Sequence, residues 1–219
     1  MSNGRRSRRR LAEPLEARWL LASDAYVEFN LVSNQQIGAS NQQTGASNQQ
    51  AGALVFDPSL VAAWGIATNP GASGGFSVSD GLAQRSNSYG GDVAGSPFVQ
   101  NVDQTVSVPS ATGQVYNGNA NEFIVHSPNP PPGGTTSIIG GPAEFIYASL
   151  DGTIYGFNSN VGQNALAVVS VPGAAFTGLT LANNGTTDQL YAADFLGGKI
   201  DVFDASFQPA KTSGSFTDP

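Results

Sequence analysis

The sequence predicts an all-β protein, built as an open, partial β-propeller of about three antiparallel blades. Three observations predict it. The 219 residues are rich in Gly (27) and Pro (13) and only 11% are charged, which suits short strands and tight turns better than helices. Short apolar runs alternate with Gly-containing turn dipeptides. The same strand-turn-strand plan recurs along the chain.

The clearest strands lie near the C-terminus, in the stretch GLTLANNGTTDQLYAADFLGGKIDVFD, residues 178–204. We expect strands at 178–182, 189–194 and 200–204. Asn184-Gly185 and Gly197-Gly198 supply the positive φ angles that tight hairpins require. Tyr191 and Phe203 are expected to be buried between stacked sheets.

Similar hairpins are predicted earlier in the chain. Residues 64–81 read as a strand, an Asn-Pro-Gly turn and a second strand, and residues 112–127 read as a hairpin around Asn117-Gly118. Residues 144–158 align with residues 189–204, with Tyr147 opposite Tyr191 and Phe157 opposite Phe203. The offset is about 45 residues, the size of one four-stranded propeller blade. Because such units cannot bury both faces alone, they are expected to stack on one another.

The chain divides into three segments. Residues 1–22 form a basic leader, residues 23–53 a linker and residues 54–219 the partial propeller. The leader, expected to be disordered, holds six Arg and two Glu, a net charge of +4; the total of −7 leaves −11 for the rest. The linker contains three consecutive SNQQxGA units, 33–39, 40–46 and 47–53. We interpret them as a tandem duplication tolerated in a surface loop; a specific binding role is the alternative.

The leader carries a motif. PLEARWLLAS, Pro14–Ser23, resembles the LEPR-XLL segment found near the N-terminus of many exported planctomycete proteins. Ala17 stands where that motif has proline. The resemblance implies export to the cell envelope or the extracellular space.

The body of the chain resembles a known group of proteins. AYVEFNLVS, DPSLVAAWGIA, DGTIYGFN, FTGLTLANNG, LYAADFLGGKIDVFD and FTDP occur in order. Together they are similar to an uncharacterised family of secreted bacterial NHL- or YVTN-like β-propellers. The resemblance implies a longer parent chain with further blades after Pro219, so that this chain is expected to be C-terminally truncated. It implies no catalytic residues.

Composition excludes several kinds of site. The chain has no Cys, which excludes disulfides and thiolate sites, and its one His excludes a multi-His zinc site. The acidic body argues against nucleic-acid binding, since it would repel phosphates. We find no apolar run of about 20 residues, so no transmembrane segment is expected.

Several residues are candidates for functional sites. Asp80 and Asp194 end corresponding predicted strands, and Asp201 and Asp204 lie on the next one. These four acids suit either Ca²⁺ binding in a channel or hydrogen bonding to turn amides, which we favour. His126 is interpreted as a loop residue rather than a catalytic base, and Trp64 as core packing rather than a ligand platform. The Gly-rich stretch 71–75 is interpreted as a turn, because no Lys-Ser/Thr follows it.

No catalytic residue or cofactor-binding residue is predicted, and no cofactor is expected except possible Ca²⁺ at an unspecified metal site. The favoured function is a noncatalytic scaffold that binds a protein or polysaccharide at the cell envelope or outside the cell. The alternative is a fragment of a propeller enzyme, such as a calcium-dependent hydrolase or lactonase or a quinoprotein-like oxidoreductase, completed by further blades. Propellers host both classes of function, so fold alone does not choose between them.

Overall fold

The computed structural model describes residues 30–35, 53–70, 75–91, 97–100, 104–127, 140–212, 214 and 216. Within these residues the fold is all-β, with several open, mostly antiparallel sheets and no α-helix. The leader, residues 1–22, and most of the SNQQ units lie outside the described residues.

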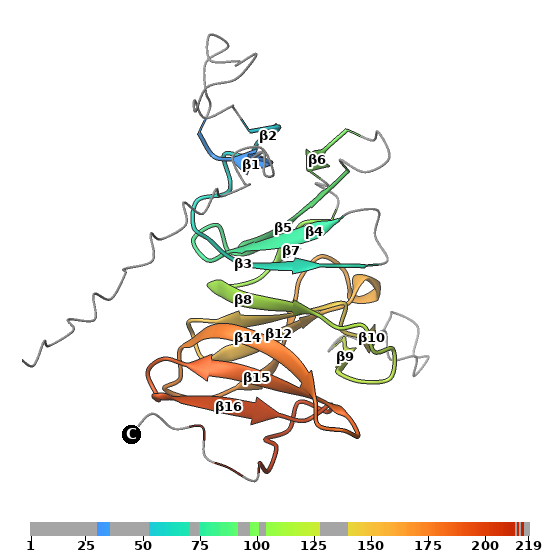
Figure 1. The fold of residues 1–219 in the computed structure, drawn as a ribbon, viewed down its shortest axis with the longest axis vertical. Helices are drawn as coiled ribbons and strands as arrows, with labels where there is room; N and C mark the ends of the chain where they lie inside the picture. The colour runs from blue at the N-terminus through green and yellow to red at the C-terminus, as the bar shows by residue number, and fades with distance from the viewer. Residues whose placement is uncertain are drawn as a thin grey trace, which may run out of the picture.

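Three sheets lie one above another along the long axis of the molecule (Figure 1). The first sheet contains β3 (Ala63–Thr68), β4 (Phe76–Asp80), β5 (Arg85–Gly90), β6 (Val99–Gln100) and β7 (Val106–Ser107). The second contains β8 (Ala111–Tyr116), β11 (Phe145–Ser149), β12 (Thr153–Phe157) and β13 (Leu166–Ser170). The third contains β14 (Phe176–Asn183), β15 (Asp188–Asp194) and β16 (Lys199–Phe203).

The remaining elements are short. β1 (Val32–Ser33) pairs in parallel with β2 (Val55–Phe56), so part of the expected linker is strand. β9 (Ile124–His126) pairs with β10 (Gly140–Pro142), and the 3₁₀ turn η3 (Ser159–Val161) follows β12. No helix in the described part of the chain is long and apolar enough to span a membrane.

The strands predicted in residues 178–204 are confirmed, as are the hairpins β3–β4 and β11–β12. The prediction of a hairpin around Asn117-Gly118 is wrong. β8 pairs with β11, and β9 pairs with β10 in an excursion between them. The Asn117 side chain bonds the carbonyls of its own loop and of Ala143, which turns the chain into this excursion instead of back along β8.

The excursion belongs to the core between the second and third sheets. Phe123 is fully buried there and packs edge-on against Phe207 at 5.1 Å between ring centroids. This cluster contains Ile146 and Ile154 of the second sheet and Leu190 and Phe203 of the third. This cluster buries apolar side chains of both sheets. The free energy gained by burying them outweighs the local preference of Asn117-Gly118 for a hairpin.

The alignment of Tyr147 with Tyr191 is off by one residue. Phe157 pairs with Phe145 and Phe203 pairs with Leu190, so Tyr191 corresponds to Ile146. Phe203 is buried as expected, but Tyr191 lies half-buried on the opposite face of the third sheet.

The first strands of the three sheets, β3, β8 and β14, run side by side (Figure 1). They meet at three corresponding glycines, Gly65, Gly113 and Gly178, which we call the glycine seam. A Cβ atom on Gly65 would lie 2.5 Å from the Thr112 carbonyl oxygen of the second sheet, and one on Gly113 would lie 2.9 Å from the Gly178 Cα of the third. At both contacts only glycine leaves room for the neighbouring backbone.

Candidate functional site

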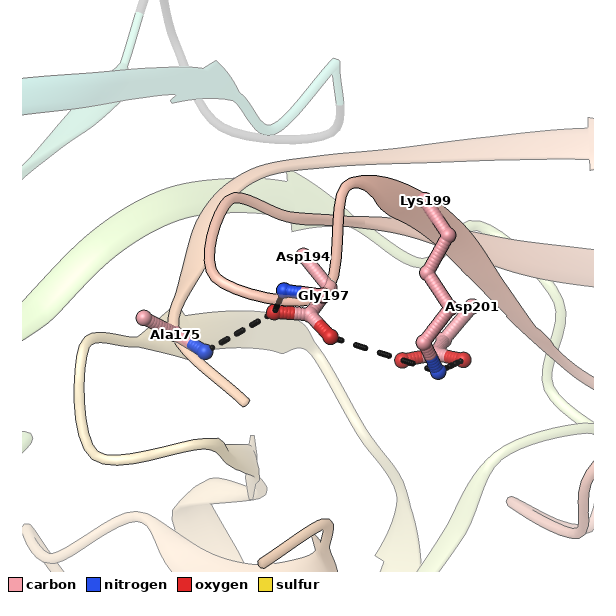
Figure 2. A network of polar contacts seen from close by, with 5 residues as sticks. All are labelled: Ala175, Asp194, Gly197, Lys199 and Asp201. Carbon is pink, nitrogen blue, oxygen red and sulfur yellow. Dashed lines mark hydrogen bonds and ion pairs between the residues drawn. The ribbon is translucent and has the colours of Figure 1, made fainter. Parts of the chain in front are cut away.

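Asp194 lies at the end of β15, and its carboxylate binds the backbone of two turns (Figure 2). One oxygen accepts hydrogen bonds from the amides of Ala175, at 3.0 Å, and Gly197, at 2.9 Å. The side chain is almost fully buried, and Lys199 approaches its other oxygen at 4.0 Å. Asp194 therefore ties the start of β14 to the turn between β15 and β16.

Asp80 makes the same kind of contact in the first sheet. Its carboxylate accepts from the amide of Ala83, three residues later, at 2.8 Å, and from the amides of Val61 and Ala62 ahead of β3. The bonds to Val61 and to Ala175 span the same separation, 19 residues. Turn capping, the favoured interpretation, is confirmed for both residues.

The other two acids do not converge with them on a common point, because Asp201 lies beside Lys199 and Asp204 follows the opposite end of β16. Asp201 binds the Lys199 ammonium at 2.5 Å, and Asp204 accepts from the amides of Ser206 and Gln208. Within the described residues, no group of three or more His, Asp or Glu side chains is arranged to hold a metal ion.

Two further candidates are located by the structure. His126 is the exposed last residue of β9, opposite Gly140. Trp64 is not a core residue: 54% of it is exposed, and its indole N–H donates to the Thr177 carbonyl at 3.0 Å. Trp64 lies on β3 of the first sheet, and its indole reaches past β8 to β14. Residues 71–74 of the Gly-rich stretch lie outside the described residues.

A buried carboxylate that sequence reasoning missed lies in the first sheet. Asp57 is only 2% exposed. One oxygen accepts from the amide and hydroxyl of Ser59, and the other from Asn87, Tyr89 and Gln100. The three bonds from Asn87, Tyr89 and Gln100 join the segment ahead of β3 to β5 and β6.

The environment holds Asp57 ionised. Burial acts to raise the pKa of Asp57, but hydrogen bonds from Ser59, Tyr89 and Asn87 more than offset it, so that pKa lies below its ordinary value. Burial, followed by the hydrogen bond to Asp57, raises the pKa of Tyr89. Because a carboxylate offers about four lone-pair positions, five donors saturate it. Asp57 is a structural anchor rather than an acid or base.

A second polar cluster lies between the first two sheets. The Ser86 hydroxyl donates to the Gln114 side-chain oxygen at 2.8 Å, and the Gln114 amide donates to the Ser77 carbonyl. Tyr147 is fully buried beside them, and this burial raises the pKa of its hydroxyl. The interface between the first and second sheets is therefore partly polar, whereas the interface between the second and third sheets is apolar.

One exposed surface of the molecule consists of turn tips. The turns between the second and third strands of the three sheets lie at the same edge of the molecule, on the left in Figure 1. Each turn exposes large apolar side chains, which we call the turn-tip residues: Leu82, Leu150, Phe195 and Leu196. Leu82 and Phe195 are 72% and 74% exposed. Asp80 and Asp194 bind the amides of the turns that carry them.

The sequence signal for this surface is the repeated Asp-x-Leu, at Asp80 and Leu82 and again at Asp194 and Leu196. It is visible in the sequence only once the turns are aligned. No protein-family model matches this chain, and no curated protein matches it.

Proposed function

We propose that this chain is part of a β-propeller that acts outside the cell as a noncatalytic scaffold, binding a protein or a polysaccharide. The observation that carries the proposal is the glycine seam. β3, β8 and β14, each the first strand of an antiparallel sheet, lie side by side with near-contact of their backbones at Gly65 and Gly113. Strands placed in this way are those that surround the axis of a propeller.

The buried carboxylates support a scaffold. Asp57, Asp80 and Asp194 are all directed to backbone or side-chain donors of the fold, where they stabilise its turns. The resemblance of Pro14–Ser23 to an export segment supports a place at the cell envelope or outside the cell.

The turn-tip residues supply the binding surface. Exposed apolar side chains on immobilised turns bind a partner with little loss of conformational entropy. Clustered exposed apolar side chains mark interaction surfaces more often than scattered ones do. The ligand is therefore expected to contact the edge of the sheets that carries Leu82, Phe195 and Leu196.

A binding experiment tests this surface. The labelled chain is applied to a glycan array and to an array of extracted envelope proteins, beside a variant with Leu82, Phe195 and Leu196 changed to Ser. The variant should lose binding with an unchanged melting temperature. A control with Leu54, Phe56 and Val99 changed to Ser, three exposed apolar positions elsewhere, should retain it. Equal binding by all three proteins would contradict the assignment, and turnover of a hydrolase or oxidoreductase substrate by the chain would contradict a noncatalytic scaffold.

A further inference from the structure

In the glycine seam, the backbone of a neighbouring sheet packs against Gly65 and against Gly113 on the side where a Cβ atom would lie, but no backbone of the described residues packs against that side of Gly178. Gly65 faces the second sheet and Gly113 faces the third. Gly178, the corresponding residue of the third sheet, faces away from the second. A Cβ atom there would meet only the Cβ of Ala193, at an ordinary 3.7 Å. The face of the third sheet that carries Gly178 therefore has room for another first strand, on the same plan as the two seams already filled.

The residues beside the seam show what this face accepts. In the first sheet, Ser77 and Ser86 receive Gln114, the residue that follows the second seam glycine. In the second sheet, the corresponding Ile146 and Ile154 belong to the core against which Leu179 packs. In both sheets, the pair of residues on the second and third strands thus matches the polarity of the neighbouring sheet's residue that packs against it.

In the third sheet the corresponding pair is Tyr191 and Ile200, an apolar pair on the open face. Ile200 is 41% exposed, and the ring of Phe216 extends the apolar surface beside Tyr191. By the rule of the other two seams, the residue inserted here is apolar and follows a seam glycine.

The chain has such a residue at its opposite end. Ile66 follows Gly65 and is 64% exposed. It pairs with Val78. The neighbouring Ser77 faces the second sheet, because its hydroxyl contacts that of Ser86, which binds Gln114, so Ile66 is directed away from that sheet. The exposed Ile66 on β3 at one end of the stack and the apolar pair of Tyr191 and Ile200 at the other end are thus complementary in polarity.

We propose that a second copy of this chain fills both faces: β3 of the partner subunit packs against Gly178, and β3 of this chain packs against Gly178 of the partner subunit. This inference rests on the proposed propeller. Propeller rings typically contain about four to eight blades, and six is the one multiple of three within that range. Two copies, each supplying the three sheets of residues 63–203, therefore close a ring of six sheets with two identical contacts, in place of the further blades that the sequence resemblance implies after Pro219.

The mass in solution tests the inference. The full chain should sediment with twice its mass of 22.5 kDa. Gly178→Ala should abolish the dimer, because a methyl group there would meet the partner's backbone as closely as one on Gly113 meets Gly178. The control Gly118→Ala, at a loop glycine with only the Tyr116 ring 3.6 Å away, should leave the dimer intact.

Mixing variants tests the arrangement of the contact. Ile66→Glu should also give a monomer, whereas Leu150→Glu, at an exposed turn of the middle sheet, should not. Each of the two monomeric variants keeps one working face, and the faces differ. An equal mixture of Gly178→Ala and Ile66→Glu, one of them labelled, should therefore associate one to one in sedimentation, although neither associates alone.

A wild-type chain that stays monomeric at high concentration would overturn the inference and leave the face to another chain or segment. A Gly178→Ala variant that still dimerises, assemblies larger than a dimer, or a mixture that stays monomeric would overturn it as well. Its failure is distinguishable from that of the propeller itself. The seam inside the chain is tested by the stability of Gly113→Ala, which does not depend on assembly.

Discussion

Gly113 and Gly178 lie so close that a Cβ atom on Gly113 would come within 2.9 Å of the Gly178 Cα and 2.6 Å of the Leu179 nitrogen. Both obstacles are backbone atoms and neither can rotate away. This contact joins the second and third sheets at their first strands and sets how closely the sheets stack.

Gly113→Ala is therefore expected to destabilise the fold by about 1–3 kcal/mol, the range for overpacking a buried site. Urea unfolding measures it. In the Ile66→Glu background, where the dimer contact is already removed, Gly178→Ala adds the same atom on the open side of the same contact and should lower the free energy of unfolding by much less than Gly113→Ala does. Equal losses in the two variants would show that the seam is not the tight contact described here.

Asp194→Ala is expected to lower the free energy of unfolding by about 2–3 kcal/mol, because it leaves the amides of Ala175 and Gly197 without their acceptor in a buried site. Chemical denaturation provides the measurement. Asp188→Ala is the control, since its side chain accepts from Asn183 at the exposed end of the hairpin. A loss of less than 0.5 kcal/mol, on the order of a surface substitution, would remove the turn-clamping role from Asp194.

The lowered pKa of Asp57 predicts that the fold loses stability in acid. Its pKa is lowered in the folded state from an ordinary 3.8, so the unfolded chain binds the proton more readily. The stabilisation is complete above the ordinary pKa and is lost as pH falls through the folded one. Asp57→Asn should be about 3 kcal/mol less stable than wild type at pH 7, since it mismatches the donors around it.

The difference in the free energy of unfolding between wild type and Asp57→Asn should become smaller as pH falls below about 4, where Asp57 itself becomes protonated. Unfolding curves of both proteins between pH 7 and pH 2.5 measure it, and their difference removes the contribution of the other carboxylates. A difference that stays constant over this range would contradict an ionised Asp57 in the folded state.

Phe203→Ala should destabilise the fold by about 3–5 kcal/mol, because it empties a packed aromatic position beside Phe176. His126→Ala, at the exposed end of β9, should change stability by less than about 0.5 kcal/mol. Thermal melting of both variants gives the comparison. Similar losses would place His126 in the core and contradict its exposure.

The sequence by itself determined the strands whose signals are local. Residues 178–204 show short apolar runs separated by Asn-Gly and Gly-Gly, and each such run became a strand paired with the next. The capping by Asp80 and Asp194 was also predictable, since a carboxylate at a strand end lies within reach of the amides of the turn that follows.

The tertiary structure alone decided the features that depend on distant partners. Asn117-Gly118 carries a hairpin signal, yet β8 pairs with β11 because Ile146 of β11 is buried against the third sheet. Trp64 is a large aromatic residue of the kind that usually packs in a core, but whether it is buried depends on which segments cover the first sheet. Asp57 draws donors from residues up to 43 positions away, and no local pattern records that convergence. Strand propensity and turn chemistry act between neighbours in sequence, whereas burial and hydrogen-bond saturation act between whichever segments the fold brings together.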